Sequence, residues 1–189
     1  MFVEEITYGT LVGGRTEGVM AFTIQFGGDA AQGDELLDVV DAIYRHRRAF
    51  GKAIRLQGAF TEDNTLDVLT LIRSLKNAGY LVAALVDGER FHSWFSYLHY
   101  IIVETKVNRW IGFEANELWY HMDEDGIEEL TIPEVSKQPE LYVVPGPEVT
   151  PNGIFRFIKD SKRVWNVMLT PERPFVEMVA YTAYKEPTE

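Results

Sequence analysis

Cysteine is absent from this sequence, which excludes disulfides, thiolate nucleophiles, cysteine-based zinc sites and cysteine-ligated iron–sulfur clusters. No apolar run approaches the roughly 20 residues of a membrane span, and the first residues, MFVEEITYGT, lack the layout of a secretory signal. Positive charge is also scarce, because 18 Lys and Arg stand against 29 Asp and Glu, a net charge of −11. We therefore expect no membrane contact and no nucleic-acid partner, and a location in the cytoplasm or within a macromolecular assembly such as a virion.

Apolar residues, by contrast, are plentiful. Of the 189 residues, 46% are hydrophobic and 13% aromatic, enough to bury one substantial core. We expect a single domain over residues 1–189, with an α/β part over 1–106 and a β-rich extension over 107–189.

Strands and helices are predicted to alternate through the first half. Strand patterns occupy 2–8, 19–26, 53–57, 80–86 and 100–104, and helical patterns follow Asp34, Thr61 and Gly88. Thr61 is the predicted cap of the second helix, whose apolar stripe is Leu66, Leu69, Ile72 and Leu75. This alternation is typical of α/β proteins and predicts a partial (βα) barrel or an open, mostly parallel sheet.

The pattern changes after Lys106. The runs ELWYHM (117–122) and IEELTI (127–132) flank the turn residues 123–126 and predict an antiparallel hairpin. Later runs at 141–146, 163–169 and 176–184 are also predicted to be extended. The C-terminal portion is therefore expected to be rich in β-structure.

The order of the predicted segments resembles that of small radical-SAM proteins of the 7-carboxy-7-deazaguanine synthase or ribonucleotide-reductase-activase type. In that family a first strand and a glycine-rich loop precede a CxxxCxxC cluster loop, and here EITYGTLVGGRTEGVMAFTIQFGGD occupies the corresponding stretch. Asp29, Gly33 and Leu36 stand where the three cluster cysteines belong. The resemblance therefore implies a scaffold of this type without its cluster.

Three further segments carry the same resemblance, which covers residues 1–106. LQGAF (56–60) corresponds to the family's Thr-Gly-Gly-Glu-Pro segment, which helps to bind SAM, and keeps Gly58 while Ala59 and Phe60 replace the last two residues. VDG (86–88) resembles a Thr-Asn-Gly turn, and Lys106 matches the lysine of a later strand. Radical chemistry is not expected, because cleavage of SAM needs an electron from a thiolate-bound cluster. We expect no cofactor.

Charged residues at predicted strand ends are the catalytic candidates. Asp87, Glu104 and Lys106 lie where α/β folds place their ligands, although strand ends also need solvated charges for structural reasons. Gly13, Gly14 and Arg15 are weaker candidates for an anion-binding loop. A flexible connection between two strands is the competing interpretation, and Gly58 is included only through the resemblance.

Aromatic residues are the candidates for a partner interface. Trp94, Phe95 and Trp110 belong to an aromatic stretch that either fills the core or forms an exposed patch. His99 and His121 lie near Glu104 and Glu117 in the predicted strands, but no histidine pair has metalloprotease spacing. We expect no metal site.

Two functional hypotheses remain. The first is a non-enzymatic binding or assembly protein on a decayed radical-SAM-like scaffold, with protein partners, a second copy of itself included, and viral assemblies among its settings. The alternative is a cluster-independent enzyme that binds a small molecule or nucleotide at the carboxyl ends of the strands. An open charged pocket there would favour the alternative, whereas a pocket filled by side chains such as Phe60 would favour assembly.

Overall fold

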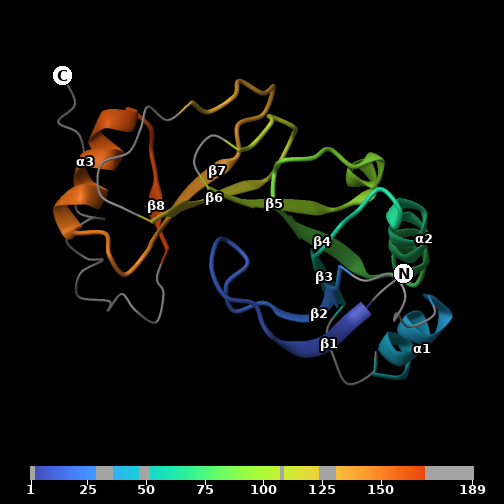
Figure 1. Cartoon of the computed structure of the whole chain (residues 1–189). Helices are drawn as coiled ribbons and strands as arrows, with labels where there is room; N and C mark the ends of the chain where they lie inside the picture. The colour runs from blue at the N-terminus through green and yellow to red at the C-terminus, as the bar shows by residue number, and fades with distance from the viewer. Residues whose placement is uncertain (1–2, 29–35, 47–51, 107–108, 124–130, 169–189) are drawn as a thin grey trace.

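A computed structural model of the chain describes residues 3–28, 36–46, 52–106, 109–123 and 131–168. Its centre is one eight-stranded sheet whose strands follow the order of the sequence, so that β1 and β8 form its two edges and the sheet is open (Figure 1). The strands are β1 (Val3–Thr10), β2 (Met20–Phe26), β3 (Ala53–Gly58), β4 (Leu81–Val86), β5 (Tyr100–Thr105), β6 (Glu117–Met122), β7 (Glu140–Pro145) and β8 (Asn166–Val167). The helices are α1 (Leu36–His46), α2 (Thr65–Asn77), the 3₁₀ helix η2 (Ser93–Tyr97) and α3 (Pro151–Ser161).

The strand directions confirm the predicted α/β class with an open, mostly parallel sheet. β1 is antiparallel to β2, and every later neighbouring pair is parallel. The connections after β2, β3, β4 and β7 contain α1, α2, η2 and α3, as crossover connections of parallel strands require. The carboxyl ends of β2 to β8 therefore all lie on the same side of the sheet, at one end of the strands.

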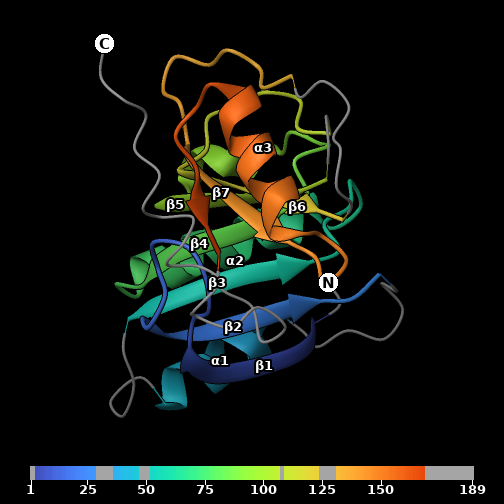
Figure 2. The same cartoon turned by 90° about the vertical axis from the view of Figure 1, so that its left-hand side faces the viewer.

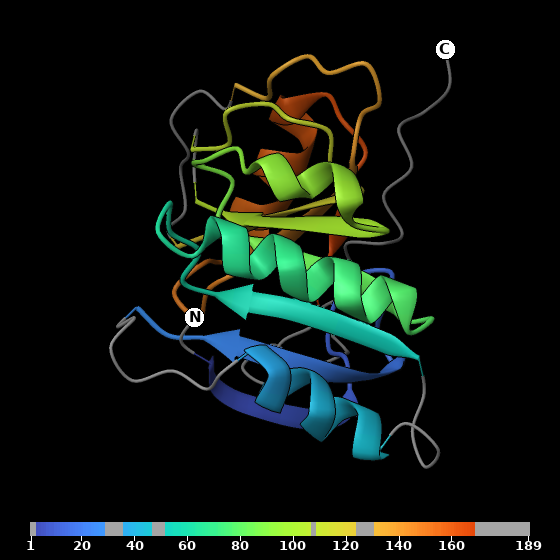
Figure 3. The same ribbon diagram turned by 90° about the vertical axis from the view of Figure 1, so that its right-hand side faces the viewer.

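The helices cover one face of this sheet. Figure 3 shows α1 and α2 side by side over the strands of the N-terminal half. Figure 2 shows α3 across β6 and β7, where Phe157 stacks on Tyr120 with ring centroids 5.5 Å apart. Burial raises the pKa of that Tyr120 hydroxyl to about 12, and Asp123 adds to the shift. No helix in the described part of the chain is both long and apolar enough to cross a bilayer.

The buried stripe of α2 differs from the predicted one. Ile72 and Leu75 are buried as predicted, but Leu66 is 67% exposed, and Val68 and Leu71 are buried in its place. The helix begins later than predicted, because Asn64 is the N-cap residue and Thr61 instead donates its backbone amide to the Asn64 side chain (3.0 Å). The core face is thus set by packing on the sheet rather than by the most hydrophobic stripe.

One prediction for the C-terminal half was wrong. β6 does not form an antiparallel hairpin, since both of its neighbours, β5 and β7, are parallel to it. The segment 151–161, for which no element was predicted from the sequence, forms α3. Thr150 caps this helix by accepting a hydrogen bond from the Gly153 amide (3.1 Å), and Pro151 begins the first turn. The predicted extended run 176–184 and residues 127–130 lie outside the described residues.

The two faces of the sheet differ in composition. The helix-covered face carries the main core, in which β3 contributes Ile54 and Leu56. The opposite face has a smaller apolar cluster, and polar side chains lie around it. The members of this smaller cluster are Ile102, Trp119, Val144 and Met168, with Leu85, Tyr100 and Tyr142 packed against them.

Candidate functional site

A polar pocket lies at the carboxyl ends of β4, β5 and β6. Its volume is about 330 Å³, and it contains all three residues that the sequence nominates for catalysis, Asp87, Glu104 and Lys106. They meet because parallel strands end at one edge of the sheet. The complete lining is Asp87, Glu89, Glu104, Thr105, Lys106, Arg109 and His121.

Two residues that line the pocket, His121 and Glu104, are joined by a hydrogen bond. Glu104 pairs in register with Trp119, so that His121, two residues further along β6, projects from the same face as Trp119 and beside Glu104. His121 Nε2 lies 2.6 Å from Glu104 Oε1, and the two side chains are 33% and 39% exposed. The donor and acceptor roles of the two ring nitrogens depend on the tautomer, so the imidazole can present either a donor or an acceptor at Nδ1.

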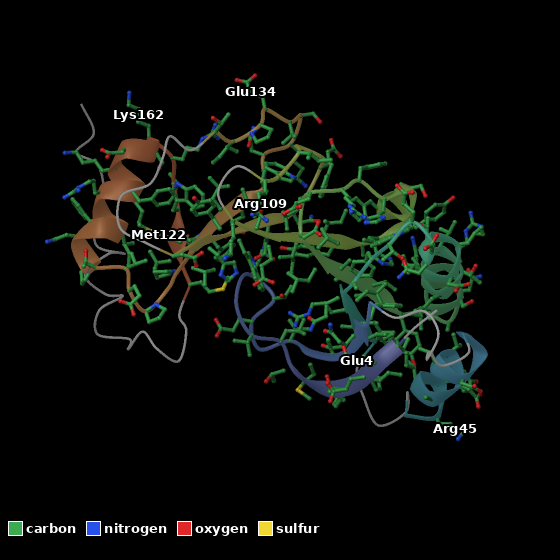
Figure 4. All side chains as sticks on the ribbon, in the orientation of Figure 1. Glu4, Arg45, Arg109, Met122, Glu134 and Lys162 are labelled. Carbon is green, nitrogen blue, oxygen red and sulfur yellow. The ribbon has the colours of Figure 1, made fainter. Side chains whose placement is uncertain are left out.

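Ion pairs form the rim of the pocket. Lys106 Nζ lies 3.0 Å from Asp123 Oδ2, and Arg109 Nη1 lies 3.0 Å from Glu89 Oε1. Figure 4 places Arg109 over the middle of the sheet, far from Arg45 and Lys162 at the two ends of the molecule. Asp87 accepts a hydrogen bond from the Glu89 amide (3.0 Å), which fixes the turn after β4. The pocket therefore offers both signs of charge to a polar ligand.

Metal ligation has little basis in the described residues. Among them, no group of three or more His, Cys, Asp or Glu side chains could hold an ion. His99 serves the backbone instead, because its Nδ1 accepts a hydrogen bond from the Val82 amide (3.1 Å). The Glu104–His121 pair is suited to holding and transferring a proton.

The loop between β1 and β2, which contains Gly13, Gly14 and Arg15, packs against the face of the sheet that the helices leave uncovered. It contacts β6, a strand about 100 residues further along the chain. Figure 1 shows this blue loop reaching back toward β6. The Arg15 amide donates to Glu117 Oε1 (2.9 Å), a buried carboxylate that also accepts from Trp119 Nε1 (3.1 Å). The loop thus already contacts an anion of its own chain, and binding of an external anion there stays a prediction.

Gly13 and Gly58 have packing roles. A Cβ on Gly13 would lie 2.8 Å from the Met168 sulfur. Gly58 has φ +105, and a Cβ there would collide with the Phe26 carbonyl and lie 2.5 Å from Gln25 Nε2. Close approach of the chain to β2 therefore accounts for this glycine without a ligand.

The tyrosines near Glu117 add to the polarity of this face. Burial is the main cause that raises the pKa of Tyr100, and the hydrogen bond to Glu117 adds to it. Burial also raises the pKa of Tyr142, whose hydroxyl donates to Glu140 (2.9 Å). Both hydroxyls therefore stay protonated and act as donors.

The proposed interface residues lie inside the main core. Trp94, Phe95 and Trp110 are 0%, 4% and 5% exposed, so they are not available to a partner in this folded chain. Phe60 does not line the polar pocket but packs against Trp94 and Phe26, with ring centroids 4.9 Å and 5.4 Å apart. Of the two outcomes foreseen for the strand ends, the structure has the open, charged pocket.

His121, Arg55 and Glu117 are site residues that sequence reasoning did not assign. His121 was predicted to lie in an antiparallel hairpin with residues 127–132, so the pairing of its strand with β5, which brings it beside Glu104, was not predicted. Arg55 and Glu117 lie within strands that the sequence predicts. A charged residue within a buried strand was the signal that could have marked each of them as a site residue.

The stretch that matches the cluster loop is described only in part. Asp29 and Gly33 lie outside the described residues, and Leu36 is the first residue of α1. The absence of cysteine from all 189 residues does not depend on the structure.

Comparisons with known proteins show a likeness in fold. No family model matches the chain, and no curated protein matches it in sequence. Among solved structures, QueE from Escherichia coli matches with a TM-score of 0.61 and 12% identity, over 89% of this chain and 93% of that one. At this identity the likeness concerns the fold alone. The chain thus has a fold like that of QueE, a radical-SAM 7-carboxy-7-deazaguanine synthase, and lacks the cysteines that a radical-SAM cluster needs.

Proposed function

We propose that this chain binds a small polar molecule in the pocket at the carboxyl ends of β4, β5 and β6, without an iron–sulfur cluster. The observation that carries the proposal is the 2.6 Å hydrogen bond between His121 and Glu104, which both line that pocket. A carboxylate that orients an imidazole leaves one ring nitrogen directed at a ligand. Lys106 and Arg109 on the rim add cationic donors, each held by an acidic partner.

The proposed binding does not depend on an iron–sulfur cluster or on radical chemistry. A [4Fe–4S] centre in this fold type needs thiolate ligands, and the chain has none. Anaerobic reconstitution with iron and sulfide is therefore expected to leave the protein without the visible absorption of a cluster and without SAM cleavage. A reconstituted cluster that cleaves SAM would contradict this exclusion.

Two other functions each have one observation in their favour. A proton-transfer enzyme on the same pocket is supported by the Glu104–His121 pair, with Asp87 and Lys106 as further charged groups. An assembly subunit is supported by Phe91, which is 62% exposed and lines a separate groove of about 530 Å³. Light scattering that shows a monomer at high concentration would count against self-assembly.

The binding proposal can be tested by NMR on the full chain. A library of small polar fragments is added to ¹⁵N-labelled protein, and we expect hits to shift the backbone amides of Glu104, Lys106 and His121. The variant His121→Ala should lose these hits, whereas Lys159→Ala on the outer side of α3 should keep them. Hits that map elsewhere, or that bind His121→Ala unchanged, would refute the proposal.

A further inference from the structure

Arg55 and Gln57 leave polar atoms unpaired on the face of the sheet opposite the helices. Both residues lie on β3, two positions apart, so their side chains share one face. Arg55 Nε and Nη1 and Gln57 Oε1 are shielded from solvent and have no hydrogen-bond partner among the described residues. Buried donors and acceptors are nearly always paired in native proteins, so these three atoms require an explanation.

Neighbouring side chains do not supply the missing partners. The residues in register with Arg55 are Thr23 on β2 and Ala83 on β4, and both are short. Burial lowers the pKa of the Arg55 guanidinium, and the charge of Glu104 acts in the opposite direction. The charge of Glu104 acts on Arg55, but the carboxylate forms its hydrogen bond with His121 rather than with Arg55. Arg55 is not among the residues that line the polar pocket, and the charge of Glu104 is what relates the two.

The orientation of the Gln57 amide follows from its neighbours. Gln25 Nε2 approaches the Phe26 carbonyl (3.5 Å), which can only accept, so Gln25 presents its oxygen to Gln57 Nε2 (2.9 Å). Gln57 Oε1 is then left as the free acceptor. The absence of a side chain at Gly58 leaves room for the Gln25 amide.

We propose that Arg55 and Gln57 form a subsite for a small oxyanion that carries a neighbouring N–H or O–H group. Guanidinium N–H groups match the oxygens of a carboxylate or phosphate, and Gln57 Oε1 would accept from the adjacent donor. This inference rests on the proposed function, because the oxyanion is one part of the molecule that the pocket at β4, β5 and β6 binds.

The subsite can be tested by the thermal unfolding of the full chain with three probes: acetate, glycolate and inorganic phosphate, each matched in ionic strength by chloride. We expect a concentration-dependent rise in Tm with glycolate or phosphate that exceeds the rise with acetate, because only the first two carry an O–H group. Whichever of the two gives the larger rise identifies the oxyanion as carboxylate or phosphate.

Variants of both residues make the test specific. Arg55→Met removes the unpaired charge at similar volume, so it should leave the Tm of the free protein unchanged or higher while weakening oxyanion binding about 10- to 100-fold. Gln57→Met should abolish the preference for glycolate over acetate. Arg55→Lys serves as a second variant with its charge retained, and it too should bind more weakly because it lacks the planar fork.

Three outcomes would overturn the subsite. The first is that no probe raises the Tm. The second is that a probe raises the Tm of Arg55→Met or Arg55→Lys as much as that of the wild type. The third is that free Arg55→Met has a lower Tm than the wild type but still binds the probe, which would make Arg55 structural. His121→Ala separates this inference from the proposed function. If His121→Ala loses fragment binding but keeps the Arg55-dependent rise in Tm with the oxyanion, both the pocket and the subsite are confirmed. If fragments bind in the pocket but no oxyanion raises the Tm, the subsite alone is refuted.

Discussion

The two faces of this sheet differ in kind, although the same strands form both: one is packed with apolar side chains and the other carries polar ones. On β3, Ile54 and Leu56 point into the helix-covered core and are at most 1% exposed, while Arg55 and Gln57 point to the other face and keep buried atoms unpaired. On β5, Val103 is fully buried and Glu104 forms a hydrogen bond with His121. The alternation of a strand thus separates packing from polar chemistry within a single residue step.

The comparison indicates where stability and where binding reside. Apolar burial on the helix-covered face contributes most of the folding free energy, whereas unpaired polar atoms on the other face cost free energy unless something binds them. Substitutions on the first face should therefore change stability strongly. Substitutions on the second should change it less and alter binding more.

The largest expected effect is on the helix-covered face, in the aromatic cluster around η2. Trp94 is fully buried and contacts Phe60 and Phe95 with ring centroids 4.9 Å and 4.8 Å apart. Trp94→Ala should lower the free energy of unfolding by about 3–5 kcal/mol, measured by urea denaturation, because it leaves a large cavity. Phe91→Ala is the control, since Phe91 is 62% exposed and its loss should cost under about 1 kcal/mol. Equal losses would show that the cluster is not a core.

A second prediction concerns the other face, where the loop after β1 packs on β6. Gly14 has φ +65, and a Cβ on it would collide with Glu117 Oε1 and lie 2.8 Å from Trp119 Nε1. Gly18 has φ +81 with open space around it. Both alanine variants carry backbone strain, but Gly14→Ala should destabilise by about 1–3 kcal/mol more than Gly18→Ala, because overpacking is added. Equal melting temperatures for the two variants would mean that the loop does not pack on β6.

Local chemistry in the sequence was enough to predict most strands and the strand-end residues. Asp87, Glu104 and Lys106 were found because parallel strands place their ends together. The direction of β6 was not found, since the turn residues 123–126 favour a hairpin locally, and only pairing with β5 and β7 shows otherwise. That one error also hid the contact between His121 and Glu104.

Other features could not follow from local pattern at all. The bond from the Arg15 amide to Glu117 joins residues 102 positions apart, and nothing near either residue announces it. The helix α3 is a different case, because Thr150 followed by Pro151 is a recognisable helix start. This signal was not used, and no element was predicted for residues 151–161.

A third, smaller effect compares two ion pairs of the pocket. His121 and Glu104 are 33% and 39% exposed, whereas Lys106 and Asp123 are 62% and 61% exposed. A double-mutant cycle with Glu104→Gln and His121→Asn should give a coupling energy of about 0.5–1 kcal/mol, because solvent screens the pair only in part. The same cycle with Lys106→Met and Asp123→Asn should give a coupling near zero. A larger coupling for the exposed pair would argue against a polar centre at Glu104 and His121.

The smallest effect is a pH dependence that belongs to the helix-covered face. His92 is 8% exposed and stacks on Trp94 (5.1 Å), and burial lowers its pKa below the ordinary 6.5. Asp87 and Glu62 oppose this shift and Arg90 adds to it. Because the unfolded chain then binds the proton more tightly, stability is full above pH 6.5 and falls as the pH decreases through that value toward the lower folded pKa.

The variant His92→Gln isolates this contribution. The free energy of unfolding, measured by urea denaturation from pH 7.5 to pH 5, should decline for the wild type. His92 should add less than about 1.4 kcal/mol per pH unit to the slope of this decline, which is the limit for one proton. In His92→Gln that added slope should vanish, while the carboxylate contributions common to both proteins remain. If the two pH profiles are parallel, the pKa of His92 is the same in the folded and the unfolded chain, and the helix-covered face is less dry than its apolar packing indicates.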